Sequence, residues 1–493
     1  MTSITATYAN HAFHSPEKIA IKTVQNSITY KEWNNLVEKT ANWLTSLRST
    51  NQILGIYLPN GIPFLQMFAG AAAAGWTSVL FDPKWKMNEI TKRLSLSLPS
   101  IFITTRKMAS KLPSLSTKIY NLEDCLSSIM NTQPIHQDQQ ADLPFYMGFT
   151  SGTTGDPKAF VRSHHSWVSS FDCNIHDFGM NGTEDVLIPG ALIHSHFLYG
   201  AISTLYLGGT VYLLDKFLPA HAHKVIEQCP ISIVYVVPTM VHAFLKLGKI
   251  ITKSITMISS GAKWEEASKR SIRSWFPQLT MYEYYGASEL SFVTVLNNKE
   301  QLSKPGSVGK PCFNVEIQIR NPNDDRAKIN EIGKIYVRSN LVFIGYLNSP
   351  NEPIKTITDD NGWVTVNDMG YFDEDGYLYL VGREKNMILY GGINIFPEEI
   401  EKVLSAHSSV DEVAVIGLAD ERWGQIVTAI IVGDAPKKEL VRHCKAELAS
   451  FKIPRKWIFV EEMPYTISGK IARAQLKQLI ESEMKTNAIS CHR

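Results

Sequence analysis

The sequence predicts an α/β protein: a large N-terminal domain of layered α/β sheets plus a β-rich subdomain, followed by a small α+β C-terminal domain. Three observations predict this fold class. Buried strands alternate with helices early in the chain, as across residues 54–81. From about residue 305 the chain changes to short strands with frequent glycine turns. A compact βα pattern then begins after Arg383, so we expect domains at residues 1–383 and 384–493.

The N-terminal elements follow from hydrophobic periodicity. Apolar residues recur at helical spacing after Trp33, and the short apolar runs around this helix are typical of buried strands. A helix of small residues over 62–76 can pack closely under a sheet. We expect, in order, a strand at 19–22, a hairpin at 27–30, the helix from Trp33, a strand at 54–58, the helix at 62–76 and a strand at 78–81.

Later elements are marked by glycine and proline. Strands are expected at 211–214 and at 231–237, where Pro238 ends the second one. The β-rich part is expected to contain strands at 315–319, 333–338 and 377–381. Phe396-Pro397-Glu398-Glu399 predicts a helix start, because proline suits the first helical position and acidic side chains favour the first turn.

Length and composition narrow the class of protein. A chain of 493 residues exceeds what one hydrophobic core usually supports. The 49 basic and 47 acidic residues give a net charge of +2, which gives no reason to propose nucleic acid or a membrane surface as a partner. No apolar run is long enough to span a membrane. The six cysteines show no Cys-x2-Cys pairing, and with no secretory signal we expect a cytoplasmic protein.

One stretch carries the strongest chemical signal, namely Thr150-Ser151-Gly152-Thr153-Thr154-Gly155-Asp156-Pro157-Lys158. It follows the apolar run 145–149, which predicts a buried strand. Its glycines allow tight turns that expose backbone amides, and its hydroxyls and one lysine add donors and a positive charge. Such a loop suits a polyphosphate. It does not fit a Walker loop, and the alternative is an ordinary polar surface loop.

The stretch resembles the signature loop of adenylate-forming (AMP-binding) enzymes, which include acyl-CoA synthetases, firefly luciferase and peptide-synthetase adenylation domains. Ala159 stands where that family most often has glycine. A second element, Tyr284-Tyr285-Gly286-Ala287-Ser288-Glu289, resembles the family's Tyr-Gly-x-Thr/Ser-Glu motif. An aromatic ring beside a tight glycine turn can stack on a purine, and a carboxylate is a hard ligand suited to Mg²⁺. Ser260-Gly261-Ala262 resembles the segment along the adenine and the acyl pocket.

Two further elements follow in the family's order. Asp368 and Arg383 resemble its ribose-binding Thr-Gly-Asp…Gly-Arg pair, with Val366 and Asn367 in place of the usual Thr-Gly. A carboxylate can accept both ribose hydroxyls. Lys470, within Ser468-Gly469-Lys470, resembles the catalytic lysine on a loop near the C-terminus.

The resemblance assigns roles to several other positions. Lys385 matches the hinge about which the small C-terminal domain turns between half-reactions, which makes that domain mobile. Gly391 and Gly392 resemble the loop that lines the thiol tunnel. His194 resembles the first histidine of the family's Phe-His-x-His-Gly element, at the carboxylate end of the acyl pocket. We expect His194 and His196 to point to opposite faces of a strand, which argues against a shared metal site. His196 is expected to be a packing residue or part of the pocket wall.

The resemblance implies an ATP-dependent ligase. A carboxylic acid attacks ATP to give an acyl-adenylate, with Mg²⁺ and Lys470 offsetting negative charge, and a thiol then displaces AMP. Ser288 and Glu289 would hold Mg²⁺ and phosphate, Tyr285 would stack on adenine, and Lys158 would contact phosphates. The region near His194 lacks the aspartate that holds an α-amino group in peptide synthetases, so a fatty or aryl acid is expected.

CoA is the expected thiol, because Gly391-Gly392 and Phe451-Lys452-Ile453-Pro454 look like free-standing acyl-CoA synthetases. We expect no carrier domain after residue 493, and so no thiol tethered in cis. Two alternatives stay open: an enzyme that loads a carrier protein in trans, and a non-catalytic nucleotide-binding relative. A luciferase-like oxygenase would be revealed by oxygen dependence. The sequence does not indicate the oligomeric state.

Overall fold

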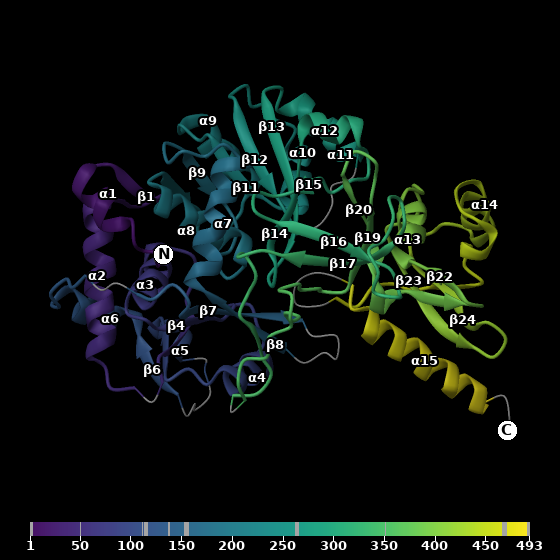
Figure 1. The fold of residues 1–493 in the computed structure, drawn as a ribbon, viewed down its shortest axis with the longest axis horizontal. Helices are drawn as coiled ribbons and strands as arrows, with labels where there is room; N and C mark the ends of the chain where they lie inside the picture. Colours follow the sequence, from purple (N-terminus) through teal and green to yellow (C-terminus); the bar gives the residue numbers. More distant parts are fainter. Residues whose placement is uncertain are drawn as a thin grey trace. The chain divides into compact units, whose positions relative to one another are not determined.

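The computed structural model describes residues 3–49, 51–110, 112, 117–136, 139–151, 157–261, 266–350, 352–465 and 471–490. The chain divides into two compact units. The first contains Met1–Thr150, Pro157–Ile317 and Val337–Val364, and the second contains Gln318–Tyr336 and Thr365–Arg493. The mixed α/β class expected from the sequence is confirmed (Figure 1). The domain boundary expected after residue 383 stays a prediction.

The first unit contains a sheet with the strand order β15-β14-β13-β12-β11-β9-β10-β1-β2. Its inner strands β9 to β13 and β10 pair in parallel, and β10 and β11 are buried along their whole length, as expected when helices cover both faces. The strands are β1 (Ile19–Lys22), β2 (Ser27–Thr29), β9 (Asp185–Ile188), β10 (Thr210–Leu213), β11 (Ile233–Val236), β12 (Ile255–Ser259), β13 (Leu279–Ala287), β14 (Ser291–Asn297) and β15 (Lys310–Pro311).

A second sheet of this unit has the order β18-β8-β7-β4-β3-β5-β6. Its strands are β3 (Ile53–Tyr57), β4 (Thr77–Leu80), β5 (Ile101–Thr104), β6 (Lys118–Asn121), β7 (Pro144–Ser151), β8 (Pro157–Ser163) and β18 (Gly345–Leu347). β3 and β4 pair in parallel, and the helix at Ile62–Ala73 connects them. This arrangement confirms the strand–helix–strand prediction for this region. β18 joins the edge of the sheet antiparallel to β8, although it is far away in sequence.

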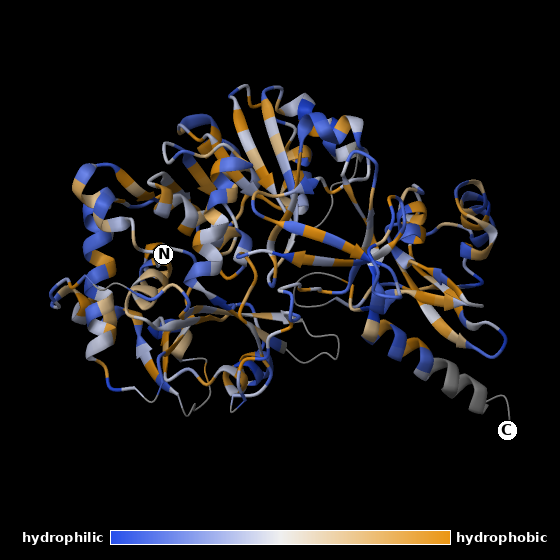
Figure 2. Ribbon diagram, viewed as in Figure 1, coloured by the Kyte–Doolittle hydropathy of each residue, from blue (hydrophilic) through white to orange (hydrophobic). Residues whose placement is uncertain are grey.

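The helices of the first unit begin and end where capping chemistry allows. Thr29 caps its helix in a capping box with Glu32, which pairs side chains with backbone donors at the helix start. These helices are α1 (Tyr8–His14), α2 (Tyr30–Ser46), α3 (Ile62–Ala73), α4 (Met87–Ser97), α5 (Arg106–Ala109), α6 (Leu122–Met130), α7 (His164–His176), α8 (Ser195–Leu207), α9 (Pro219–Gln228), α10 (Pro238–Leu247), α11 (Glu266–Trp275) and α12 (Asn298–Ser303). In Figure 2 β12 is largely orange, whereas α2 mixes blue and orange along its length.

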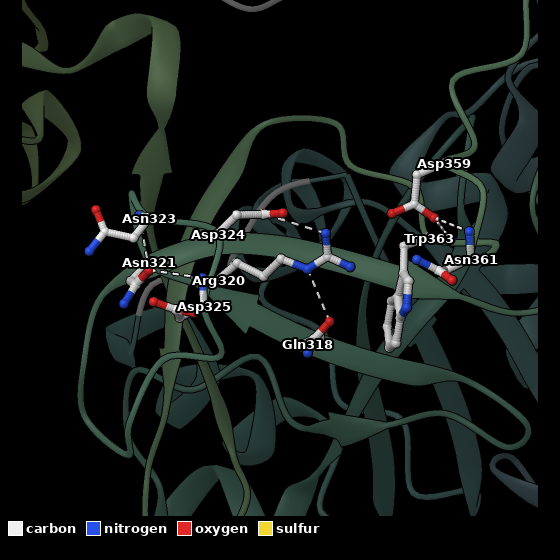
Figure 3. A network of polar contacts seen from close by, with 9 residues as sticks. All are labelled: Gln318, Arg320, Asn321, Asn323, Asp324, Asp325, Asp359, Asn361 and Trp363. Atoms are coloured by element: carbon white, nitrogen blue, oxygen red, sulfur yellow. Dashed lines mark hydrogen bonds and ion pairs between the residues drawn. The ribbon is translucent and has the colours of Figure 1, made fainter.

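The β-rich part forms a sheet in the order β16-β17-β19-β20, with β16 (Glu316–Arg320), β17 (Gly333–Arg338), β19 (Asp368–Phe372) and β20 (Leu378–Arg383). Its antiparallel strand pairs confirm the β-rich part of short strands that the sequence predicts. Arg320 ties the end of β16 together, because its Nε donates to Gln318 at 3.0 Å and its guanidinium lies 4.0 Å from the centre of the Tyr336 ring. Figure 3 shows Arg320 between Gln318 and Asp324.

The C-terminal part has a sheet in the order β22-β21-β24-β23, with β25 paired to β24. Its elements are β21 (Ile388–Tyr390), β22 (Ile393–Ile395), β23 (Glu412–Asp420), β24 (Gly424–Val432), β25 (Lys456–Phe459), α13 (Pro397–Ser405), α14 (Lys437–Glu447), α15 (Arg473–Ser490) and the 3₁₀ helices η1 (Glu384–Asn386) and η2 (Ser450–Lys452). The predicted helix start at Pro397 is confirmed, with Glu398 and Glu399 in the first turn.

The cysteines of the described residues are free thiols. Burial raises the pKa of four of them, Cys125, Cys173, Cys312 and Cys444. Over the described residues, no helix is both long and apolar enough to cross a bilayer.

Candidate active site

The predicted phosphate loop joins two neighbouring strands. β7 carries Thr150 and ends at Ser151, and β8 begins at Pro157. Lys158 lies on β8 with an exposed side chain, and its Nζ is 5.5 Å from the centre of the Tyr346 ring. The remaining predicted loop residues, Gly152, Thr153, Thr154 and Gly155, lie outside the described residues, as do Ala262 and Lys470.

Arg162 is a buried cation at the far end of β8, and the sequence reasoning did not select it. Its guanidinium donates to the backbone oxygens of Ser288 at 2.9 Å and Leu341 at 2.6 Å. Its Nε donates to the Ser166 hydroxyl at 3.2 Å. Burial lowers the pKa of Arg162 to about 10, while the Glu289 carboxylate acts in the opposite direction. Arg162 therefore fixes the backbone directly before Glu289. The available sequence signal was a charged residue directly after the apolar run Phe160–Val161, within the same predicted strand.

Glu289 is 8% exposed and is held on two sides. The Tyr346 hydroxyl donates to its Oε1 at 2.5 Å, and its backbone oxygen accepts from the amide of Phe343 at 2.8 Å. Among the described residues, no donor contacts its other carboxylate oxygen, Oε2. An ionised carboxylate with one oxygen fixed and one available is a hard ligand of the kind that Mg²⁺ prefers. The residue therefore fits the predicted metal role.

The predicted purine turn at Tyr284–Ala287 is wrong as a turn. These residues continue β13, which pairs antiparallel with β14 through a bulge between Tyr285 and Gly286. Side chains alternate along a strand, so Tyr284 and Tyr285 leave opposite faces. Glycine is needed at 286, because a Cβ there would lie 2.0 Å from the backbone oxygen of Ser291. The need for glycine is therefore close approach between two strands and not a tight turn.

Tyr284 joins the second predicted segment to His196. Its hydroxyl lies 2.9 Å from Nδ1 of His196. Burial raises the pKa of Tyr284, and a side-chain hydrogen bond with Ser260 opposes that effect. Ser260 follows the end of β12, and Gly261 adopts a left-handed φ of 94° after it. The structure thus brings Ser260 and Tyr284 together. Their role at the adenine and the acyl group stays a prediction.

The strand expected at His194 and His196 is also wrong. His194 is the N-cap residue of α8, and His196 lies in its first turn. Nε2 of His196 is 2.9 Å from the backbone oxygen of Val236 and must donate to it, so Nδ1 accepts from Tyr284. Burial lowers the pKa of His196 to about 4, which leaves a neutral packed ring. His194 keeps an exposed surface. Desolvation by the neighbouring protein atoms lowers the pKa of its ring, and the Asp82 carboxylate acts in the opposite direction.

The predicted ribose pair is adjacent in the structure of the second unit. Asp368 opens β19 and faces Arg383, the last residue of β20, with Arg383 Nε donating to Asp368 Oδ1 at 3.0 Å. Asn367, where the family uses glycine, has a φ of 62°. Asparagine tolerates this left-handed region better than most side chains. The substitution therefore keeps a backbone conformation that glycine would also adopt.

The remaining predicted positions lie just beyond this pair. Lys385 is in the 3₁₀ helix η1, and the neighbouring Glu384 forms an ion pair with Lys334 at 2.9 Å. Gly391 and Gly392 make the two-residue turn between β21 and β22, with φ values of 54° and 86°. Both values lie in the left-handed region, which a type I′ hairpin requires and glycine supplies.

Comparison with known proteins agrees with this arrangement. The chain matches the AMP-binding enzyme family over residues 8–347 and the AMP-binding enzyme C-terminal domain over residues 399–470. It is 47% identical to the uncharacterized acyl–CoA ligase YhfT of Bacillus subtilis (strain 168), covering 98% of this chain and 99% of that protein. It is 26% identical to the 2-succinylbenzoate–CoA ligase of Bacillus cereus (strain ATCC 10987 / NRS 248), covering 95% of this chain and 97% of that protein.

A solved structure gives the same result. The fold is similar to that of o-succinylbenzoate CoA synthetase (MenE) from Bacillus subtilis in complex with the acyl-adenylate intermediate OSB-AMP. The TM-score is 0.86 at 26% sequence identity, covering 97% of this chain and 98% of that one. The chain belongs to the AMP-binding enzyme family.

Proposed function

We infer that this protein is an AMP-forming acid–thiol ligase, which activates a carboxylic acid with ATP as an acyl-adenylate and transfers the acyl group to CoA. The observation that carries this inference is the network at the start of the phosphate strand. Lys158 and the buried Glu289 contact the same tyrosine, and within the described part of the chain no donor reaches Oε2 of Glu289. Relatives named as CoA ligases along nearly the whole chain support CoA as the acceptor.

We assign the roles of the site as follows. Lys158 and the loop before it hold the phosphates of ATP, Ser288 and Glu289 hold Mg²⁺, and Asp368 with Arg383 holds the ribose. Ser260, Tyr284 and Tyr285 flank the adenine and the acyl group. Bound Mg²⁺ would neutralise charge on the phosphates, and a buried carboxylate is suited to hold that ion. In the same proposal, residues 384–493 form a mobile domain whose Lys470 stabilises the charge that develops on adenylation.

The acyl group is proposed to be a fatty or aryl acid. Neutral His196 and the rings around it support this choice, because Tyr284 packs on Phe292 with ring centres 4.5 Å apart. An apolar aromatic surface binds an uncharged acyl group better than a second ionised group. We place the reaction in the cytoplasm, where the free cysteines of the described residues would stay reduced.

The decisive experiment is a mass-spectrometric screen of the purified full chain. It would contain ATP, Mg²⁺ and a panel of carboxylic acids, run with and without CoA. Acyl-CoA formed from one acid class would establish the ligase and name its substrate. Accumulation of acyl-AMP alone would point to a carrier protein loaded in trans. Binding of ATP without either product across a broad panel would favour a non-catalytic nucleotide-binding protein.

A further inference from the structure

We propose that Tyr346 is a positioning residue that orients the Glu289 carboxylate for the metal–nucleotide complex. The proposal rests on the ligase function inferred above and adds a residue that the predicted motifs do not contain. Tyr346 contacts two oppositely charged side chains with different parts of one ring. Its hydroxyl donates to Glu289 Oε1 at 2.5 Å, and Lys158 Nζ lies 5.5 Å from its ring centre.

The backbone of Tyr346 is fixed from both sides. In β18 it pairs antiparallel with Phe160 of β8, in the strand that carries Lys158. On its other side it exchanges two backbone hydrogen bonds with Lys355, at 2.9 and 2.8 Å. Gly345 allows this close approach, because a Cβ at that position would lie 2.4 Å from the backbone oxygen of Lys355. The tyrosine therefore enters the site from a rigid strand and not from a loop.

The ring of Tyr346 is also fixed. Phe343 packs against it edge-on, with ring centres 4.9 Å apart. Phe343 in turn donates its amide to the backbone oxygen of Glu289, so the strand segment and the carboxylate residue are connected twice. Arg162 binds Leu341 on the same segment and Ser288 beside Glu289. Three parts of the chain, distant in sequence, are thus tied together around one carboxylate.

In this geometry the two oxygens of the Glu289 carboxylate have different roles. A hydroxyl donor on Oε1 selects one rotation of the carboxylate plane and leaves Oε2 toward a ligand. Groups that orient a metal ligand from behind commonly change metal affinity or activity by roughly 10–100-fold when removed. A tyrosine that only fills space would have no such effect on the metal dependence. The proposal can therefore be tested by removing only the hydroxyl oxygen of Tyr346.

The test is Tyr346→Phe in the full chain, because phenylalanine keeps the ring over Lys158 and removes only the hydroxyl. Two quantities are measured as functions of Mg²⁺ concentration: ATP–pyrophosphate exchange, and binding of a non-hydrolysable ATP analogue by calorimetry. We expect the Mg²⁺ concentration for half-maximal binding to rise about tenfold. Exchange should fall by a similar factor and recover in part at high Mg²⁺. Conversion of preformed acyl-AMP to acyl-CoA should stay within about twofold of wild type.

Tyr30→Phe is the matched control, since Tyr30 is a buried tyrosine of the same unit whose hydroxyl donates to the backbone oxygen of Gly209 at 2.7 Å. It should lower the melting temperature and leave the Mg²⁺ dependence unchanged. A double-mutant cycle with Glu289→Gln adds a second readout: Tyr346→Phe should have no further effect on Mg²⁺ dependence once the carboxylate is gone.

Two results would overturn the proposal. One is an unchanged Mg²⁺ dependence in Tyr346→Phe, and the other is an equal loss in both half-reactions. Failure of the ligase function itself gives a different pattern. In that case wild type makes no adenylate from any acid, while Mg²⁺-dependent binding of the ATP analogue still distinguishes Tyr346→Phe from wild type.

Discussion

Two arginines of this protein, Arg162 and Arg473, are held in opposite ways. Arg162 is buried and donates to neutral acceptors, the backbone oxygens of Ser288 and Leu341 and the hydroxyl of Ser166. Arg473 instead pairs with the carboxylate of Glu401, through Nη2 and Oε2. In the first arrangement, the hydrogen-bond acceptors that the described residues offer the cation are neutral groups. The second depends on an ionised carboxylate whose pKa is raised by burial, against the influence of Arg473.

The surroundings of the two arginines differ in the same sense. Arg162 lies in a strand inside a sheet, directly behind the predicted phosphate loop. Arg473 begins α15 two residues after Ile471. Ile471 forms an isolated bridge with Tyr465, and the amide of Ala472 donates to the backbone oxygen of Pro464 at 2.7 Å. Tyr465 and Ile471, the two residues of this bridge, are the described residues on either side of the predicted lysine segment. The comparison teaches that the hydrogen bonds of Arg162 beside Glu289 do not depend on pH. The ion pair of Arg473 and Glu401 is lost when the carboxylate binds a proton.

The largest effect is expected at the lysine loop. Lys470→Ala should lower adenylate formation by on the order of a hundredfold or more, because a positive charge is removed where negative charge develops. Preformed acyl-AMP should still be converted to acyl-CoA. Both half-reactions are measured separately by mass spectrometry. An equal loss in the two steps would show that Lys470 has no special place in adenylation.

The next largest effect is expected at Arg162. Arg162→Met should lower the free energy of unfolding by about 2 kcal/mol, because the backbone oxygens of Ser288, Leu341 and Ser166 lose a donor inside the protein. Urea denaturation of the full chain measures this loss. It should be accompanied by weaker binding of the ATP analogue, since Ser288 is no longer fixed beside Glu289.

Arg93→Met is the control for Arg162→Met. Arg93 is also buried, donates to the backbone oxygen of Glu89 at 3.0 Å and lies 4.0 Å over Trp85. Its loss should lower stability by about 1 kcal/mol and leave nucleotide binding unchanged. If both variants weaken nucleotide binding equally, Arg162 has only a general packing role.

A smaller effect follows from His164, which starts the helix after β8. Burial lowers its pKa to about 4, from an ordinary value of 6.5. The unfolded chain therefore binds a proton that the folded chain does not, so stability is present above the unfolded pKa and is lost as the pH falls from about 6.5 toward 4. We expect this histidine to contribute roughly 1–2 kcal/mol to the loss by pH 5.

His164→Phe tests that slope, since phenylalanine can keep the stacking on Phe145, whose ring centre lies 4.8 Å away. The variant should be less stable at neutral pH, because Ile4 loses its acceptor on Nδ1. Its stability should fall less steeply with acid than that of wild type. Identical slopes for the two proteins between pH 7 and pH 5 would refute the assignment.

The smallest effect has the opposite sign and belongs to the lysine-loop side. Burial raises the pKa of Glu401, so the folded chain binds a proton that the unfolded chain has released. Stability from this group is therefore present below the ordinary glutamate pKa and is lost as the pH rises through the folded value. Glu401→Gln should remove this dependence, by less than about 1 kcal/mol. Hydrogen exchange of α13, corrected for intrinsic rates, measures it; an unchanged profile would contradict the prediction.

Local patterns predicted much of the fold. The bounds of β17 at Gly333–Arg338 and the helix start at Pro397 agree with the sequence, because hydrophobic alternation and helix capping act within a few residues. The turn expected at Tyr284–Ala287 was wrong. A glycine that is required for close contact between two strands cannot be distinguished in the sequence from a glycine that is required for a turn.

The candidate site was predicted unevenly for a related reason. Asp368 and Arg383 were identified by their place in motifs, and strand register brings them together. Tyr346 was missed because its role depends on pairing between β18 and β8, which are separated by most of the first unit. Arg162 was missed because its partners are backbone oxygens, which have no sequence signature. Long-range register and backbone acceptors are what single-sequence patterns do not contain.

The buried thiols also give the protein a practical property. Protonated cysteines inside a core react slowly with maleimides, and burial raises the pKa of Cys125, Cys173, Cys312 and Cys444. Once Cys229 and Cys491 are replaced by serine, a new surface cysteine would be the preferred target for a fluorophore. Phe13, 81% exposed in the first unit, and Leu389, 50% exposed in the second, are suitable positions for a donor and an acceptor dye. Energy transfer between them would test, one molecule at a time, whether the C-terminal domain rotates during turnover as proposed.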